Sequence, residues 1–206
     1  MAEKTVQEKA GARFGAGTVT MLDRLMSELA GPNRRIRQDA SHMLAEMARD
    51  HQDQFEGKLD AVVPALADAL FRPEAQTRWE SLDALYELAT ARPDVVVQAY
   101  DGAEASLFDE TSSRVRIASF RLLARLGSKS AELSDKVWPL LDEAIQCFHG
   151  DPGYRDMLAS MLEFVQGEAS AESKAALVDR ISFDAENGRG YVKVQSAEIV
   201  KAAEGK

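Results

Sequence analysis

The sequence has little of what disulfide-linked and membrane-spanning proteins contain. Its 206 residues include one cysteine, Cys147, so the chain cannot form an internal disulfide. A scarcity of disulfides is also typical of proteins in reducing compartments. No apolar stretch approaches the roughly 20 residues that a membrane-spanning helix needs. These absences predict a cytoplasmic protein that does not cross a membrane.

The chain is also short of basic residues. Lysine and arginine number 25 against 34 aspartates and glutamates, which gives a formal net charge of −9. Nucleic-acid-binding proteins usually carry a basic face, because neutralising phosphates supplies most of their nonspecific affinity. The acidity therefore disfavours nucleic acid and favours a basic protein or peptide as the partner.

The sequence lacks motifs for a cofactor, a metal ion or a catalytic group. His42, His51 and His149 share no helical spacing and have no cysteine or histidine companions. Gly15 and Gly17 do not follow a strand, so they do not form a phosphate-binding loop. We predict no cofactor, no metal site and no enzymatic activity.

Residues 1–17 differ from the rest of the chain. They mix glycine with charged residues and lack the apolar segment of a signal peptide. We expect this segment to be flexible. Residues 18–206 are predicted to form a single domain, because a hydrophobic content of 45% suits one continuous core.

What the sequence does contain is a repeat with a period of about forty residues. Each copy is marked by a basic residue, and small or apolar residues follow three, seven and ten positions later. This spacing places those residues on one stripe of an α-helix. The five basic residues, called anchors below, are Arg37, Arg78, Arg116, Arg155 and Lys193.

A second apolar helix is predicted before each anchor. Pro64 and Pro139 are expected near the starts of two of these helices, where a missing N–H costs little. The segment before Arg116 contains Gly102 and is expected to be kinked or shorter. One hairpin cannot bury its apolar face alone, so the sequence predicts an all-α solenoid of about five stacked helical hairpins.

The stretch VVPALADALFRPEAQTRWESLDALYELA, residues 62–89, resembles the HEAT repeat. The same outline recurs in VWPLLDEAIQCFHGDPGYRDMLASMLEFV (137–165) and TMLDRLMSELAGPNRRIRQDASHMLAEMA (20–48). The resemblance implies an armadillo-like α-superhelix whose anchor arginines bind carbonyls or a carboxylate at the preceding helix end. HEAT arrays are mostly scaffolds, so it also implies a non-enzymatic protein–protein interaction scaffold.

By the same resemblance, the first helix of each hairpin lines the concave surface of the array. Several of these helices carry more acidic than basic residues. We therefore predict an acidic concave surface that binds a basic protein or peptide. The candidate contacts are Asp60, Asp68, Asp142, Asp179 and Asp184.

Two aromatic residues of the second repeat are further candidates for partner binding. Trp79 and Tyr86 lie on one helical stripe, with Asp83 between them. Tryptophan and tyrosine are common hot spots of protein interfaces. The sequence is equally consistent with packing of both rings against adjacent repeats.

Three arginines of the third repeat, Arg114, Arg121 and Arg125, share one helix face. One interpretation is an anion site for phosphate or an acidic protein. The favoured interpretation is ion pairing between neighbouring repeats. Asp83 and Arg121 occupy equivalent positions of two repeats, and so do Glu87 and Arg125. Such exposed pairs stabilise a fold by about 0–1 kcal/mol each.

The combination of Trp79, Asp83 and an arginine of the next repeat is also similar to the HEAT-like DNA alkylpurine glycosylases. Those enzymes hold a damaged base with Trp, Asp and Arg in a basic groove. The resemblance implies an alternative function, a DNA-binding protein or glycosylase-like enzyme, which the net charge disfavours.

Overall fold

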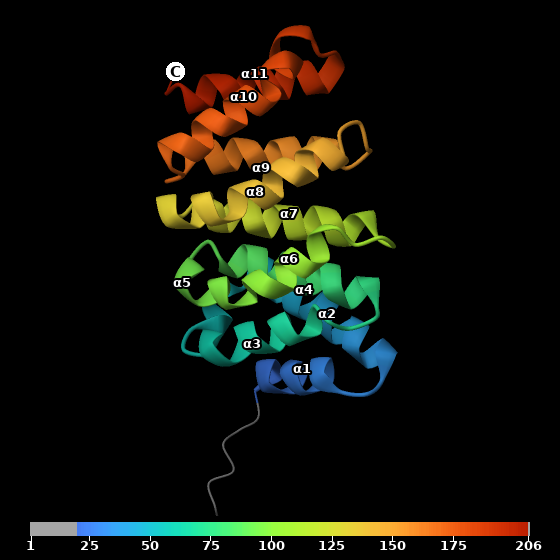
Figure 1. Cartoon of the computed structure of the whole chain (residues 1–206). Helices are drawn as coiled ribbons and strands as arrows, with labels where there is room; N and C mark the ends of the chain where they lie inside the picture. The colour runs from blue at the N-terminus through green and yellow to red at the C-terminus, as the bar shows by residue number, and fades with distance from the viewer. Residues whose placement is uncertain (1–19, 206) are drawn as a thin grey trace, which may run out of the picture.

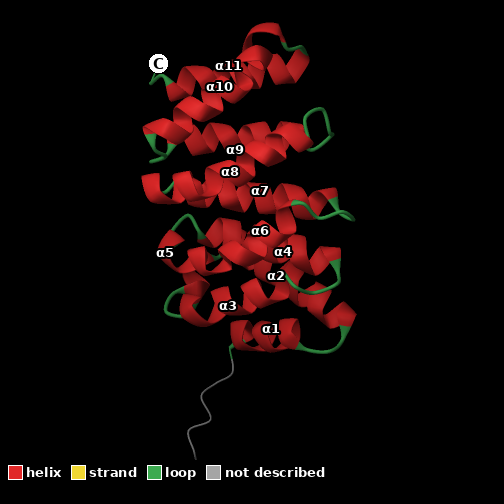
Figure 2. Ribbon diagram, viewed as in Figure 1, coloured by secondary structure: helices red, strands yellow, loops and turns green. Residues whose placement is uncertain are grey.

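In the computed structural model, which describes residues 20–205, every regular element is a helix (Figures 1 and 2). The helices form five successive hairpins that stack in one array, with α1 at one end and α11 at the other (Figure 1). The predicted all-α solenoid is therefore confirmed. The segment 1–17, predicted to be flexible, lies outside the described residues.

Each hairpin contributes a first helix and a second helix, and the two sets form two layers. The first helices are α1 (Met21–Ala30), α3 (Leu59–Ala69), the segment α5–α6 described below, α8 (Ala131–Cys147) and α10 (Ala171–Asn187). The second helices are α2 (Arg34–Asp50), α4 (Ala75–Leu88), α7 (Ser113–Gly127), α9 (Tyr154–Gln166) and α11 (Gly190–Ala203). A short 3-10 helix, η1 (Gln52–Phe55), joins the first two hairpins.

Short polar side chains start several of these helices. The Thr20 hydroxyl accepts from the Asp23 N–H, while the Asp23 carboxylate accepts from the Thr20 N–H, which completes a capping box. The same kind of side-chain cap is present at Asn33, Ser112, Ser130 and Ser170. Each cap satisfies an N–H that has no partner within the helix and so fixes where that helix begins.

The first helix of the third hairpin is interrupted, as its sequence predicts. It consists of α5 (Pro93–Val96), the 3-10 helix η2 (Val97–Ala99) and α6 (Tyr100–Leu107). Gly102 packs against Leu70 of the preceding hairpin, where an added Cβ would meet the Leu70 side chain at 2.8 Å. The absence of a side chain at Gly102 therefore lets α6 pack closely against Leu70.

One sequence prediction about prolines is wrong. Pro64 lies in the middle of α3, which begins at Leu59, and Pro139 lies in the middle of α8, which begins at Ala131 after its Ser130 cap. The cap decides the start of this helix, and the proline is tolerated farther along it.

The core lies between the layers and along the second helices. Leu85 and Leu123, seven positions after their anchors, are fully buried. The position three after each anchor is also fully buried in all five repeats. These residues are Ala40, Ser81, Ser119, Leu158 and Ser196. Small residues at four of these five positions favour a close approach of neighbouring helices.

Three of the five anchors have the structural role that the resemblance implies, whereas the guanidinium of Arg155 lies 5.9 Å from the centre of the Tyr191 ring. Arg37 donates to the Gly31 carbonyl at 2.9 Å, and Lys193 donates to the Glu186 carbonyl at 2.8 Å. Arg116 likewise donates to the Asp109 carbonyl at 2.7 Å. Each of these carbonyls lies at the end of the preceding first helix or in the turn after it, so the anchor closes its own hairpin.

Three anchors reach a carboxylate of the following repeat, and one of them is Arg116, which lies 4.0 Å from Asp151. Arg37 pairs with Glu74, and Arg78 pairs with Asp109 at 2.7 Å. Burial opposes ionisation of Glu74, but the hydrogen bond from Arg37 outweighs it and holds the pKa of Glu74 below its usual value. The pKa of Asp109 is lowered as well, because hydrogen bonds from Thr111 and the charge of Arg78 outweigh burial.

Candidate functional site: a groove across the second helices

Three adjoining cavities open on the surface of the second helices. Their volumes are about 300, 380 and 320 Å³, and all three are lined by Ile117 of α7 and Asp156 of α9. The middle repeats therefore carry one continuous depression, called the inner groove below. It is defined by Trp79, Tyr86, Ile117, Arg121 and Asp156.

The structure brings Trp79 and Tyr86 to this groove, together with the arginines that follow them in the array. The guanidinium of Arg114 lies 5.1 Å from the centre of the Trp79 ring. The guanidinium groups of Arg121 and Arg125 lie 4.4 and 3.7 Å from the centre of the Tyr86 ring. Both aromatic rings are thus cation–π partners of α7, and both are only partly buried.

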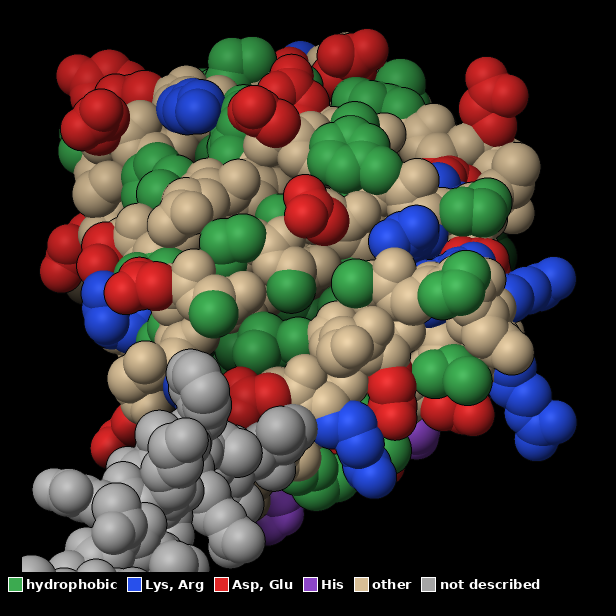
Figure 3. All heavy atoms as spheres, turned by 90° about the horizontal axis from the view of Figure 1, so that it is seen from below, with side chains coloured by type: hydrophobic (Ala, Val, Ile, Leu, Met, Phe, Trp, Pro, Cys, Tyr) green, Lys and Arg blue, Asp and Glu red, His purple; other side chains and the backbone are tan. Residues whose placement is uncertain are grey.

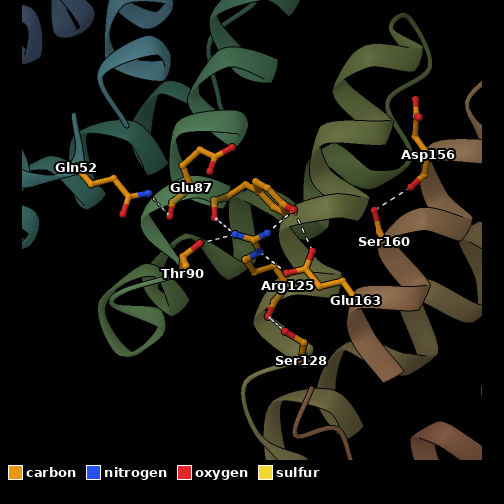
Figure 4. Close-up of polar contacts among 9 residues, drawn as sticks. Gln52, Glu87, Thr90, Arg125, Ser128, Asp156, Ser160 and Glu163 are labelled. Atoms are coloured by element: carbon orange, nitrogen blue, oxygen red, sulfur yellow. Dashed lines mark hydrogen bonds and ion pairs between the residues drawn. The ribbon is translucent and has the colours of Figure 1, made fainter. Parts of the chain in front are cut away.

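Arg125 is the centre of a polar network that joins three hairpins. It donates to Glu163 of α9 at 2.5 Å and to Thr90 after α4 (Figure 4). It also donates to the Tyr86 hydroxyl, which itself donates to Glu163 at 2.9 Å. Burial and the charge of Glu163 together raise the pKa of Tyr86, so the phenol remains a hydrogen-bond donor.

The contact between Tyr86 and Glu163 shows which layer lies inside the bend of the array. These residues belong to α4 and α9, which are separated by α7, whereas repeats of a solenoid ordinarily contact only their direct neighbours. A contact across an intervening helix indicates that the second helices converge on this side of the array. Neighbouring second helices also contact one another more extensively than neighbouring first helices do. The second helices therefore form the inner layer. The prediction that the acidic first helices line the concave surface is wrong, because it reversed the two layers.

Of the two predicted ion pairs between equivalent positions, one is confirmed and the other is wrong. Arg121 pairs with Asp83 at 3.1 Å, as expected. The pair of Arg125 with Glu87 is wrong, because Arg125 turns toward Glu163 of the next repeat instead. Burial raises the pKa of Asp83 despite the opposing charge of Arg121.

The five candidate aspartates lie on the outer layer, and two of them are used within the array. Asp142 accepts from Arg180 at 2.5 and 3.0 Å, and Asp184 pairs with His149 at 2.9 Å. The other three are exposed on the outer surface. These are Asp60 of α3, Asp68 of α3 and Asp179 of α10. Only this second group has carboxylates that are open to a partner.

Sequence reasoning missed two residues at the centre of the groove, Ile117 and Asp156. Both follow their anchors directly, as Trp79 does, and Val194 occupies the same position in the last repeat. Val194 is 66% exposed. The repeat could have revealed Ile117 and Asp156, since the position that Trp79 occupies on α4 recurs on each neighbouring second helix.

Charges of both signs occur around the groove. Arg121 pairs with Asp83, Arg125 pairs with Glu163, and Arg116 lies 4.0 Å from Asp151. The end of the array seen in Figure 3 likewise has acidic, basic and hydrophobic side chains interspersed. Arg116, Arg121 and Arg125 thus each face an acidic residue and do not form a continuous basic track of the kind that follows a nucleic-acid backbone. No helix among residues 20–205 is long and apolar enough to span a bilayer.

Comparison with known proteins supports the fold. No protein-family model matches the sequence, and no curated protein matches it. A designed armadillo repeat protein in complex with the peptide (KR)4 superposes with a TM-score of 0.73 at 14% identity, over 88% of this chain and 81% of that one. The chain has the α-solenoid fold of armadillo and HEAT repeat proteins.

Two further structures have the same solenoid architecture. The archaeal HEAT-like repeats protein from Thermococcus onnurineus NA1 has a TM-score of 0.61 at 15% identity, over 88% of this chain and 70% of that one. An engineered protein has a TM-score of 0.72 at 15% identity, and this chain spans 89% of its own length but 47% of that protein. At such low identities these similarities establish the fold alone.

Proposed function

We propose that this solenoid is a non-enzymatic scaffold that binds a segment of a partner protein in the inner groove. The observation that carries the proposal is the continuity of three cavities around Ile117. Partly buried aromatic rings beside an apolar floor are typical of interface hot spots. The designed armadillo protein that holds a (KR)4 peptide supports peptide binding by this fold.

The two surfaces of the array would contribute differently to binding. The exposed acids of the outer layer, with a net charge of −9 for the chain, favour encounter with a basic partner. The groove would fix affinity, since apolar and aromatic contacts slow dissociation more than exposed charges do. We therefore propose that the partner is basic overall, with its bound segment in the groove.

The test begins with the partner that co-purifies from the native cell lysate, identified and then prepared in pure form. Ile117→Glu and Trp79→Ala should each weaken its binding, because they remove the floor and one wall of the groove. Ile36→Glu is the matched control, since Ile36 is an exposed isoleucine on α2, away from the cavities. Unchanged binding of Ile117→Glu, combined with loss of binding by Asp60→Lys and Asp179→Lys, would place the site on the outer layer instead.

A second candidate function rests on one observation. Trp79, Asp83 and Arg121 line the same cavity of about 320 Å³, as they would in a HEAT-like glycosylase. Against this, Asp83 is already paired with Arg121, and the surrounding charges are mixed. An electrophoretic shift with duplex DNA at low salt tests it. A shift that Asp83→Asn and Arg121→Ala both change would favour this candidate over peptide binding.

A further inference from the structure

Most charged side chains that line the inner groove have a partner within the array. Arg121 holds Asp83, Arg116 lies against Asp151, and Glu163 holds Arg125. Two groups differ. Within residues 20–205, neither the Arg114 guanidinium nor the Asp156 carboxylate makes an ion pair or a hydrogen bond.

These two groups are exposed and lie on different helices beside the same apolar residue. Arg114 comes from α7 and touches the groove through the Trp79 ring, whereas Asp156 comes from α9. Ile117 lines the same cavity as both. Figure 4 shows the Asp156 carboxylate pointing away from the Arg125 network, while its backbone carbonyl accepts from Ser160. The free charges thus flank an apolar floor.

The spacing of the helices fixes how far apart a partner must present its contacts. Trp79, Ile117 and Asp156 occupy the same register position on α4, α7 and α9. Packed helices lie about 8–10 Å apart. A polyproline-II segment advances about 3.1 Å per residue and repeats its face every third residue, which is about 9 Å. Residues three apart on such a segment would meet first the Trp79 ring with the Arg114 guanidinium beside it, then Ile117 and then Asp156.

We propose that the groove binds an extended peptide segment with an apolar residue at its centre, an acidic residue three positions to one side and a basic residue three positions to the other. The carboxylate pairs with Arg114, the apolar side chain covers Ile117, and the cation pairs with Asp156. This inference rests on the proposed function and specifies its ligand. The attraction of a basic partner by the net negative charge of the chain is compatible with this charge pattern, because ion pairs in the groove and the overall charge act at different distances.

The test uses three synthetic peptides with Pro-Pro spacers, which hold the extended conformation. All three have leucine at the centre and differ only at their two ends. The mixed peptide has glutamate at one end and lysine at the other. The basic peptide has lysine at both ends, and the acidic peptide has glutamate at both ends. The native chain should bind the mixed peptide roughly five- to tenfold more tightly than either other peptide, the gain expected of about 1 kcal/mol per added ion pair. Fluorescence anisotropy at low and physiological salt measures the order.

Charge reversals should change that order in a predictable way. Arg114→Glu makes both ends of the groove acidic, so this variant should prefer the basic peptide. Asp156→Lys makes both ends basic, so this variant should prefer the acidic peptide. Arg35→Glu is the matched control for the first change, because Arg35 precedes its anchor by the same two positions on α2 and is also exposed. Asp39→Lys, an exposed α2 residue, is the control for the second.

The outcomes separate this inference from the proposed function. If all peptides bind, Ile117→Glu abolishes binding and neither charge reversal changes the order, the groove is the site and the charge pattern is wrong. If Ile117→Glu leaves binding of every peptide unchanged, or no peptide binds, both proposals fail for extended segments. A native preference for the basic peptide that Arg114→Glu does not strengthen would also overturn the pattern.

Discussion

The inner and outer layers of this solenoid are built from the same hairpins but hold together in different ways. The second helices are joined by a network in which Arg125, Tyr86 and Glu163 link three hairpins. The first helices are joined by contacts between direct neighbours, such as Arg180 with Asp142 and the Ser170 and Ser173 hydroxyls with Asp135. The network of the inner layer therefore spans three hairpins, and the surface of the same layer carries the three cavities of the groove. The comparison shows that, in this array, the polar contact between non-neighbouring hairpins and the groove occur on the same layer.

The largest effect should come from the core that both layers share. Leu85→Ala and Leu123→Ala should each cost about 2–5 kcal/mol of unfolding free energy, because both side chains are fully buried and would leave a cavity. Arg114→Ala, at the surface, should stay within about 0.5 kcal/mol. Chemical denaturation of the three variants gives the comparison. If Arg114→Ala were the most damaging, the repeat register would be wrong.

An intermediate effect should separate the two layers. Arg125→Ala should cost about 1–3 kcal/mol, because Glu163 loses its ion pair and the Tyr86 hydroxyl loses its donor in a partly buried site. Arg180→Ala should cost less than about 1 kcal/mol, since its pair with Asp142 is partly exposed. Equal losses in urea denaturation would show that the inner network adds nothing beyond an ordinary ion pair.

Acid should weaken the links between hairpins. The pKa values of Glu74 and Asp109 are lowered in the fold, so the ionised forms stabilise it above the unfolded-state pKa values. This stability is lost as the pH falls through those values toward the lowered ones. Unfolding free energy measured from about pH 7 down to about pH 3 should fall more steeply for the native chain than for Asp109→Asn.

The sequence predicts the repeats well because helical periodicity depends on local spacing. The anchors, the buried Leu85 and Leu123, and the pair of Asp83 with Arg121 all follow from equivalent positions on stacked helices. The direction of the bend does not follow from spacing, and it decided which layer is concave. The ion-pair partner of Arg125 was also predicted incorrectly, because a long side chain can reach either neighbouring repeat.

The candidate site was predicted only in part for the same reason. Trp79 and Tyr86 are conspicuous as residue types, and the structure places both at the inner groove. Ile117 and Asp156 are ordinary residues whose importance comes from their neighbours in space. The aspartates of the first helices stood out by charge, yet Asp142 and Asp184 are paired within the array.

The smallest effect on stability should come from the exposed acids of the outer layer. Asp60→Lys and Asp179→Lys should change the unfolding free energy by less than about 0.5 kcal/mol, since exposed substitutions usually do. Their effect should instead be kinetic. Reversing two charges should slow association with a basic partner and flatten its salt dependence, because exposed charges act over roughly 8 Å at physiological ionic strength. The dissociation rate should stay unchanged if the groove holds the bound segment. Surface plasmon resonance at two salt concentrations measures both rates, and a faster dissociation of these variants would mean that the outer layer contacts the partner directly.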